Sequence, residues 1–239
     1  LEPRTISELK SDVVDQIAAG EVVERPAHLV KELIENSIDA AASEIEIEFE
    51  NGGRSVRVTD DGVGIRPMDL PRALARHATS KIQTADDLWK LQSFGFRGEA
   101  LASIGAVSRL ELTSRPRTEA TASKIVSEFG RIEPVAASSG NLGTTLAIRD
   151  LFENVPARLK FMKSEVAEGA QIRQVVKASA MSHPEVGFRL RSKGKLELSC
   201  RSGEDFGTRV QNILGVKLHT AHGEFEGFRV ELAFSGPQD

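Results

Sequence analysis

Two side chains that could together hold a cation and activate a water molecule stand four residues apart, at Glu32 and Asn36. Apolar residues around them recur with helical spacing, so we expect a helix over 27–42 that carries both on one face. Mg²⁺ prefers oxygen ligands, and a carboxylate one turn away could polarise an attacking water. The alternative interpretation is an ordinary solvated polar face of a helix.

Three glycine-containing segments add further chemistry. Residues 60–64 (DDGVG) follow a predicted strand, where a carboxylate can accept N–H groups while glycine permits close backbone approach to a ligand. Residues 95–101 (GFRGEAL) precede a predicted helix, whose unpaired amides favour phosphate. Residues 143–146 (GTTL) open a strand. Each segment alone also fits an ordinary turn, and no GxxxxGK[ST] pattern of a P-loop occurs.

The elements that must position these groups follow from apolar periodicity. We expect helices over 11–20, 27–42, 68–76, 99–105, 163–181 and 206–214. We expect strands over 45–49, 56–58, 107–113, 122–129, 143–148, 187–192 and 195–200. The apolar stripe of the helix over 163–181 would consist of Val166, Ala170, Ile172, Val175, Val176 and Ala180. This order predicts an α+β sandwich with helices on one face of a largely antiparallel sheet.

Composition limits the class of protein. The chain has 239 residues, 40% hydrophobic and 28% charged, which predicts one large or two small globular domains. A single cysteine excludes an internal disulfide and a Cys-based zinc site, and no apolar run is long enough to span a bilayer. We therefore expect a soluble, cytosolic protein. The net charge of −4 is uneven, because residues 1–50 carry 4 Lys and Arg against 13 Asp and Glu.

Five segments carry a resemblance to a known family. They are 16–26 (QIAAGEVVERP), 31–37 (KELIENS), 75–82 (ARHATSKI), 95–103 (GFRGEALAS) and 150–158 (DLFENVPAR). With the glycine-containing segments, they resemble the GHKL ATPase superfamily and, within it, the N-terminal ATPase domain of the MutL DNA mismatch-repair family. The resemblance is dense over residues 9–162 and looser beyond. It implies a Bergerat-type two-layer α/β sandwich with a mixed, mostly antiparallel sheet.

The resemblance implies a role for each matching residue. Glu32 would be the general base, and Asn36 would carry Mg²⁺ and the phosphates. Asp60 would accept the adenine amino group above Gly64, with Thr144 or its neighbour Thr145 helping through water. The residues implied to fold over the ribose and phosphates are Thr79, Ser80, Lys81, Arg97, Gly98, Glu99, Ala100 and Leu101.

Two positions depart from the family pattern. Asp61 stands where asparagine is common, which we expect to add a charge near the adenine base. Ala41 stands where glycine is common. His77 could be mistaken for a catalytic base, but no Ser or Cys motif accompanies it, so we favour a structural or lid role.

The resemblance also implies the domain organisation, with ATP and Mg²⁺ as cofactors. Residues 1–202 would form the GHKL ATP-binding domain, and 203–239 the beginning of a second, ribosomal-protein-like domain. Family members place the lysine that contacts the γ-phosphate in that second domain, past residue 239. We therefore expect an ATPase that, as the chain given, binds ATP but is only weakly active and largely monomeric.

The implied partners are those of mismatch repair. They are a MutS-type mismatch-recognition protein, other repair proteins, and a second MutL-type chain in a homodimer or heterodimer formed when ATP is bound. Weak, nonspecific DNA binding is also implied, and residues 154–177 carry five Lys and Arg against two Glu. No membrane is implied. The location would be the bacterial cytoplasm and nucleoid, or the nucleus of a eukaryote.

Two other functions remain as alternatives. The first is a nucleotide-gated interaction module that binds ATP and DNA with negligible turnover. The second is another GHKL member, such as a chaperone or topoisomerase subunit, against which the ATSKI and GFRGEAL segments count. A histidine kinase is disfavoured, because no phospho-acceptor helix precedes the predicted domain.

Overall fold

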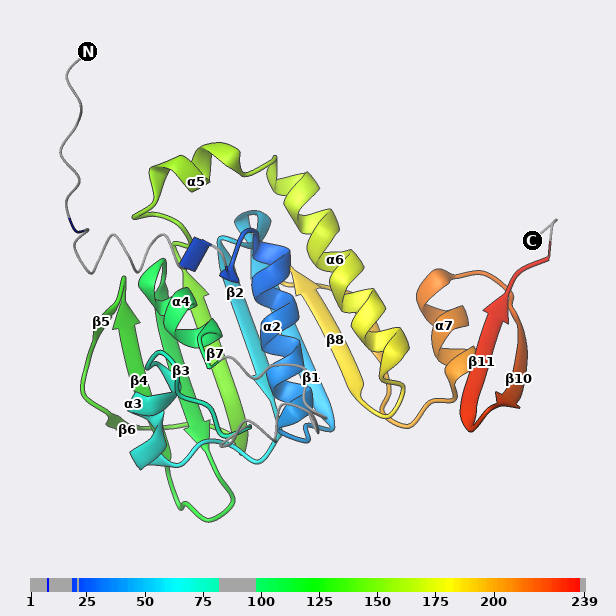
Figure 1. Ribbon diagram of the computed structural model, residues 1–239, viewed down its shortest axis with the longest axis horizontal. Coiled ribbons are helices and arrows are strands. Elements are labelled where there is room, and N and C mark those ends of the chain that lie inside the picture. The colour runs from blue at the N-terminus through cyan, green and yellow to red at the C-terminus, as the bar shows by residue number, and fades with distance from the viewer. Residues whose placement is uncertain (1–7, 9–18, 21, 82–97, 237–239) are drawn as a thin grey trace.

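One mixed sheet with helices on one face forms most of the molecule (Figure 1). The structure is a computed structural model that describes residues 8, 19–20, 22–81 and 98–236. Its helices are α2 (Pro26–Asp39), α3 (Leu70–Ala73), α4 (Ala100–Ala106), α5 (Pro156–Phe161), α6 (Glu165–Ser182) and α7 (Phe206–Leu214), with 3₁₀ turns η1 (Asn51–Gly53) and η2 (Pro67–Asp69). Its strands are β1 (Glu44–Glu50), β2 (Ser55–Asp60), β3 (Arg109–Arg115), β4 (Ala122–Glu128), β5 (Arg131–Ile132), β6 (Ala136–Ser138), β7 (Gly143–Arg149), β8 (Gly187–Ser192), β9 (Lys195–Cys200), β10 (His219–Phe225) and β11 (Phe228–Phe234).

The sheet topology confirms the predicted fold class. Within the described residues the main sheet has nine strands: eight run in the order β5-β4-β3-β7-β2-β1-β8-β9, and the ninth, β6, pairs with β4. Strands β1 and β8 are parallel, whereas the other neighbouring pairs are antiparallel. Helices α2, α4 and α6 lie on the same face, and β10 and β11 form a separate hairpin (Figure 1).

Several predicted elements have the expected bounds, and others do not. Strands β8 and β9 and helix α7 match their predictions residue for residue. The predicted helix over 68–76 is instead a 3₁₀ turn followed by the single turn of α3, and β3 begins two residues later than predicted. Helix α5 and the short strands β5 and β6 were not predicted. The predicted helix over 11–20 lies outside the described residues except for 19–20.

The β1–β2 hairpin and α2 form the centre of the core. Alternate residues of β1 (Ile45, Ile47 and Phe49) are buried, and so are Val56 and Val58 of β2. The apolar face of α2 packs over them, and its fully buried side chains are Leu29, Val30, Leu33 and Ile34. Burial of these branched side chains fixes the rotation of α2 about its axis, and hence where its polar residues point.

Strand β1 also carries four of the thirteen acidic residues of positions 1–50, which are Glu44, Glu46, Glu48 and Glu50. Glu46 pairs with Arg191 of β8 at 2.8 Å, and Glu44 pairs with Arg189 at 3.2 Å. These cross-strand pairs neutralise the acidic strand locally. Cations on the neighbouring strand β8 therefore compensate part of the negative charge of residues 1–50.

Helix α6 corrects part of the predicted apolar stripe. Ile172, Val176 and Ala180 are buried as expected, but Val166 is 80% exposed and Ala170 is also exposed. The first turn instead buries Gly169 and the charged Glu168. The prediction was wrong at this end because a specific ion-pair partner, supplied by another segment, makes burial of a carboxylate possible.

That partner is Arg25, directly before α2. Glu168 is fully buried, and its Oε1 accepts a hydrogen bond from Arg25 Nη1 at 2.6 Å and another from the backbone N–H of Lys163 at 2.8 Å. The pair joins the N-terminus of α2 to the N-terminus of α6. It therefore helps to set the position of the helix that carries Glu32 and Asn36.

A second buried cation joins α7 to the main body. Arg209 is fully buried and donates to the carbonyl oxygens of Ala180 at 2.8 Å and of Pro184 and Val186 at 3.0 Å. Its Nε also bonds Glu204 at 2.6 Å. The predicted domain division at 202/203 stays a prediction, but these contacts hold α7 against the segment that follows α6.

None of the helices in the described ranges combines the length and apolarity needed to cross a membrane.

We expect Arg25→Met to lower the free energy of unfolding by about 3 kcal/mol, because it leaves the Glu168 carboxylate buried without its cation. Urea unfolding measures the change. The double variant Arg25→Met/Glu168→Gln should recover part of the loss, since the uncompensated charge is gone. Arg57→Met is the control, because Arg57 and Glu48 are both about half exposed and their charged atoms lie 3.9 Å apart. This substitution should lower the free energy of unfolding by less than about 1 kcal/mol. Equal losses at the two sites would contradict the role assigned to burial.

Candidate active site

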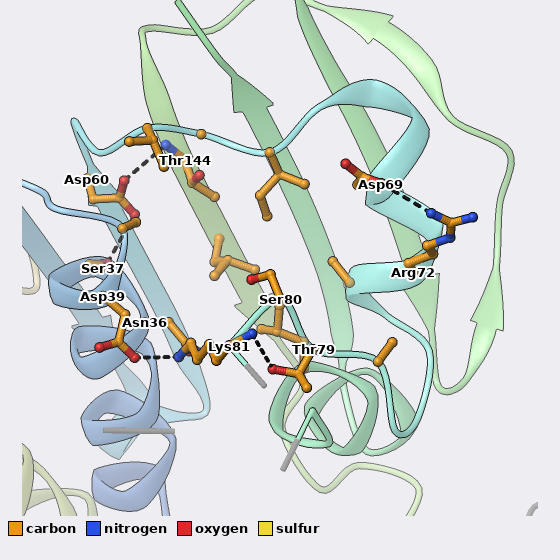
Figure 2. A pocket seen from close by; sticks show the side chains of 18 of the residues that line it. Asn36, Ser37, Asp39, Asp60, Asp69, Arg72, Thr79, Ser80, Lys81 and Thr144 are labelled. Carbon is orange, nitrogen blue, oxygen red and sulfur yellow. Dashed lines mark hydrogen bonds and ion pairs between the residues drawn. The ribbon is translucent and has the colours of Figure 1, made fainter. Parts of the chain in front are cut away.

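A cavity of about 1200 Å³ opens between α2, the end of β2, the α3 region and the start of β7. Figure 2 shows Asp60 and Thr144 on one side of it and Asn36, Asp39 and Lys81 on another. Eight residues that the resemblance assigns to nucleotide or metal binding line this cavity: Asn36, Asp60, Gly64, Thr79, Ser80, Lys81, Leu101 and Thr144. Residues more than one hundred positions apart in the chain therefore meet in one place.

Asp60 ends β2 and is the buried acceptor of the cavity. Only 7% of the Asp60 surface is exposed. Its Oδ1 accepts hydrogen bonds from the backbone N–H groups of Gly62 at 3.0 Å and Thr144 at 3.2 Å. Oδ2 lies 3.0 Å from the hydroxyl of Ser37. Burial raises the pKa of the Asp60 carboxyl above its usual range, and the three hydrogen bonds only partly offset that effect.

Two serines that the sequence reasoning missed organise this side of the cavity. Ser37 on α2 bonds both Asp60 and the carbonyl oxygen of Leu33, at 3.1 Å. Ser114 of β3 accepts from the backbone N–H of Ile65 at 2.8 Å and donates to the carbonyl of Gly143 at 2.9 Å. It therefore ties the glycine turn after β2 to the start of β7.

A signal for both serines was present in the periodicity. Ser37 lies on the buried side of the amphipathic helix, and Ser114 follows Leu110 and Leu112 at alternate, inward-facing positions of β3. A polar residue at a predicted core position indicates a buried hydrogen bond, which the sequence alone does not assign to a partner.

Thr144 and Thr145 have different surroundings. Thr144 lines the cavity, and its hydroxyl lies 3.0 Å from that of Ser114. Thr145 lies 3.3 Å from the hydroxyl of Thr59 and does not line the cavity. Because successive strand residues face opposite sides of a sheet, only Thr144 can reach a ligand beside Asp60.

Two glycines are required by the local backbone. Gly64 has φ of +73°, and a Cβ there would come within 2.8 Å of the backbone N of Pro116. Gly98 has φ of +63°, and a Cβ there would come within 2.5 Å of the carbonyl oxygen of Ala78. Both positions combine a left-handed conformation with close backbone approach, which excludes other residue types without rearrangement.

The other side of the cavity carries charge. Lys81 Nζ donates to Asn36 Oδ1 at 3.0 Å and forms an ion pair with Asp39. Its backbone N–H donates to the hydroxyl of Thr79 at 3.1 Å, which closes a tight turn. The carbonyl oxygen of the Asn36 amide thus already faces a cation, so its orientation suits a metal ion.

Of the other residues singled out from the sequence, His77 lines the cavity, whereas Glu32, Gly98, Glu99 and Ala100 do not. Glu32 is half-buried on α2, one turn before Asn36, and is not among the lining residues of the described cavity. Gly98 and Glu99 precede α4 and Ala100 is its first residue, and none of the three lines the cavity. His77 Nδ1 lies 2.9 Å from Glu99 Oε1, which ties the residues before 82 to those after 97. Arg97 lies outside the described residues.

The two departures from the family pattern have structural explanations. Asp61 Oδ1 accepts hydrogen bonds from the backbone N–H groups of Ser43 at 2.7 Å and Glu44 at 2.9 Å. Asp61 therefore does not line the cavity, contrary to the expectation of a charge near the adenine base. Partial burial alone would raise the pKa of Asp61, but the hydrogen bond from the Ser43 hydroxyl and those from the two backbone N–H groups outweigh it, and the pKa lies below its usual range. Ala41 has φ of 54°, the left-handed region in which glycine is favoured.

Comparison with known proteins identifies the family. Residues 24–140 match the family described as histidine kinase-, DNA gyrase B- and HSP90-like ATPase. The MutL protein of Neisseria meningitidis serogroup A is 45% identical over 222 residues, which are 92% of this chain and 34% of that protein. The solved Aquifex aeolicus MutL ATPase domain complexed with ADP is 32% identical, with a TM-score of 0.76, over 91% of this chain and 79% of that one. The chain belongs to the MutL family.

Family membership confirms the resemblance seen in the motifs and the GHKL fold. The MutL protein of Pseudomonas fluorescens is 47% identical over 210 residues, which are 87% of this chain and 33% of that protein. The chain spans about a third of the length of the curated MutL relatives it matches. The part of MutL that it represents is the ATPase domain.

We expect Asp60→Asn to be more stable than the parent near pH 7 in the absence of nucleotide. The raised pKa means that the folded protein favours the protonated carboxyl of Asp60. The stability that this preference contributes is fully present below the unfolded-state pKa and is lost as the pH rises through the folded-state pKa. An amide keeps the two backbone donors on its oxygen and can donate to Ser37. The advantage of the variant should therefore shrink as the pH falls toward about 4. Urea unfolding at several pH values measures it.

Asp61→Asn is the matched control, because the lowered pKa of Asp61 gives the opposite sign. The stability that the ionised Asp61 carboxylate contributes is present above the unfolded-state pKa and is lost as the pH falls through the folded-state pKa. The control should be less stable than the parent near neutral pH, with a difference that shrinks in acid. A pH-independent difference for Asp60→Asn would contradict the assigned burial effect.

Proposed function

We propose that this chain binds ATP with Mg²⁺ in the cavity beside α2 and hydrolyses it as the nucleotide-dependent part of a mismatch-repair protein. The observation that supports this most strongly is Asp60, a buried carboxylate whose donors leave acceptor capacity on Oδ2 toward the cavity. An ionised carboxylate is an acceptor only, so it selects the amino group of adenine over the carbonyl of guanine. The related Aquifex aeolicus domain is described as complexed with ADP.

Asn36 fits the role of metal ligand. Its Oδ1 is directed at a cation, the ammonium of Lys81, at 3.0 Å. Across the described ranges there is no group of three or more His, Cys, Asp or Glu side chains that could hold a metal ion. This suits Mg²⁺, which keeps several waters and takes one or two protein ligands together with substrate phosphates. When bound, the ion would neutralise charge on those phosphates.

Glu32 fits the role of general base. It lies on α2 four residues before Asn36, so both side chains project from neighbouring positions on one face of the helix. With phosphates held at Asn36, a carboxylate one turn away would orient a water and accept its proton. The Lys81 ammonium, on the same side of the cavity, would donate to phosphate oxygens.

We expect Glu32→Ala to lower the rate of ATP hydrolysis by about 10²–10⁴-fold and to change ATP affinity only a few-fold, because the base acts on water and not on the nucleotide. Single-turnover hydrolysis and equilibrium nucleotide binding measure the two effects. Glu35→Ala is the matched control on the same helix, since Glu35 pairs with Lys31 at 2.7 Å outside the cavity lining. Near-normal turnover in the Glu32 variant would exclude it as the base.

The finer context of MutL function is part of the same proposal. We place this chain with a MutS-type recognition protein and with a second MutL-type chain when ATP is bound. The matched relatives named above are bacterial, which favours the cytoplasm and nucleoid as its location. The γ-phosphate lysine of the second domain and the weak activity of the chain as given stay predictions.

Residues 154–177 offer fewer cations for contact with DNA phosphates than the sequence suggested. Arg158 bonds the backbone carbonyls of Gly20, Val23 and Glu24, and Arg173 forms a two-pronged pair with Glu197 at 2.7 and 2.8 Å. The exposed cations that remain in this segment are Lys160, Lys163 and Lys177. Three lysines support weak contact with phosphates and no reading of base sequence.

We expect DNA binding that is weak, independent of sequence and lost between about 50 and 200 mM salt, because each phosphate contact releases counterions. Changing Lys160, Lys163 and Lys177 together to Glu should abolish it, as measured by fluorescence anisotropy with a labelled duplex. Lys124→Glu on β4 is the surface control and should bind as the parent does. Binding that is unchanged across this salt range would contradict an electrostatic contact.

A further inference from the structure

The charged side of the cavity already holds a cation that belongs to the chain itself. The Lys81 ammonium donates to Asn36 Oδ1 at 3.0 Å and pairs with the carboxylate of Asp39, as Figure 2 shows. The side chains of Lys81 and Asp39 are only 21% and 11% exposed. This is therefore a largely buried arrangement of one cation between two oxygen ligands.

Helix geometry brings the two ligands together. Asn36 and Asp39 are three residues apart on α2, so they lie one above the other on the same face. Lys81 approaches from a separate segment, where the hydroxyl of Thr79 holds its backbone N–H. An amide oxygen and a carboxylate are also the ligand types that hard divalent cations prefer.

We propose that Asn36 and Asp39 form a two-oxygen cation site, which the Lys81 ammonium fills until nucleotide phosphates draw it away and a divalent metal takes its place. This rests on the proposed function, because it concerns the entry of the metal that accompanies ATP. It adds Asp39 to the site, and it gives Lys81 a role before the nucleotide arrives.

The physical reason is competition for the same oxygens. An ammonium within hydrogen-bonding distance of Asn36 leaves no room for a metal ion at that oxygen, and it repels a doubly charged ion strongly in a partly buried place. The ammonium also compensates the Asp39 carboxylate, which would otherwise be costly to bury. Phosphates offer Lys81 a more highly charged partner, so nucleotide binding removes the competitor.

The consequence is a linkage between the two ligands. Nucleotide raises the affinity for metal not only by adding phosphate ligands but also by vacating two protein ligands, and metal raises the affinity for nucleotide by the same factor. If the Lys81–Asp39 pair were merely structural, its removal would loosen the fold without creating a place for a metal ion.

The test is a titration of the nucleotide-free chain with Mn²⁺, in which electron paramagnetic resonance detects the free ion. We expect Lys81→Met to bind Mn²⁺ at least ~10-fold more tightly than the parent, because the competing charge is gone. Lys81→Arg keeps a cation and should bind as weakly as the parent. Lys124→Met should also leave Mn²⁺ binding unchanged, because Lys124 is a partly exposed residue of β4 outside the cavity lining.

A double variant identifies the ligands. Lys81→Met/Asp39→Asn should lose most of the gained affinity, since it removes the carboxylate while keeping its shape. Far-ultraviolet circular dichroism confirms that each variant is folded before it is titrated. No gain in Lys81→Met, or a gain that persists in the double variant, would overturn the proposed site.

Addition of ADP separates this inference from the proposed function. The parent chain should take up Mn²⁺ when ADP is present, and Asn36→Ala should not. If the parent does so and Lys81→Met gains nothing without ADP, the inference alone fails. If the parent takes up no Mn²⁺ even with ADP, the proposed function fails and the inference fails with it.

Discussion

Burial of one face of α2 is the constraint on which the cavity depends. Leu29, Val30, Leu33 and Ile34 are fully buried against the sheet, and large branched side chains in a packed core allow little rotation of the helix. The next turn of the same helix then has to present Ser37 to Asp60 and Asn36 to the cavity. A rotation of a few tens of degrees would separate these groups, so the hydrophobic contact fixes the polar chemistry.

The cavity and the segments beside it contain groups that the fold holds in constrained environments. Asp60 is buried, and its pKa is raised as a result. Gly64 and Gly98 adopt left-handed conformations against neighbouring backbone, and Ala41 adopts one without the freedom of glycine. Such features concentrate where a protein must keep a ligand-binding geometry ready in advance. The hydrophobic packing around β1, β2 and α2 provides the stability that offsets them.

Charged groups in this protein act in two distinct ways. Pairs on the open face of the sheet, such as Glu46 with Arg191, are partly solvated and contribute little each to stability. Arg25 with Glu168, and Arg209 with its ring of carbonyl oxygens, are buried and join segments distant in sequence. The net charge of the chain therefore says little about its partners, because several of the charges in the described residues are compensated within the protein itself.

The sequence by itself determined the family, the fold class and some of the groups that line the cavity. Periodicity located most elements, because a helix or strand that buries one face must repeat its apolar residues at that spacing. Short elements such as α5, β5 and β6 escaped, since a few residues carry too little periodic signal. The motifs around Asn36, Asp60, Lys81 and Thr144 named residues that meet in one cavity.

Only the tertiary structure decided which partner each polar group has. It directs Asp61 at Ser43 and Glu44 rather than into the cavity, makes Ser114 a bridge between two loops, and buries Glu168 against Arg25. It also places Lys81 on Asn36 and Asp39. These contacts join residues 17 to 143 positions apart. Their geometry depends on how whole elements pack, and no local pattern of residues records that.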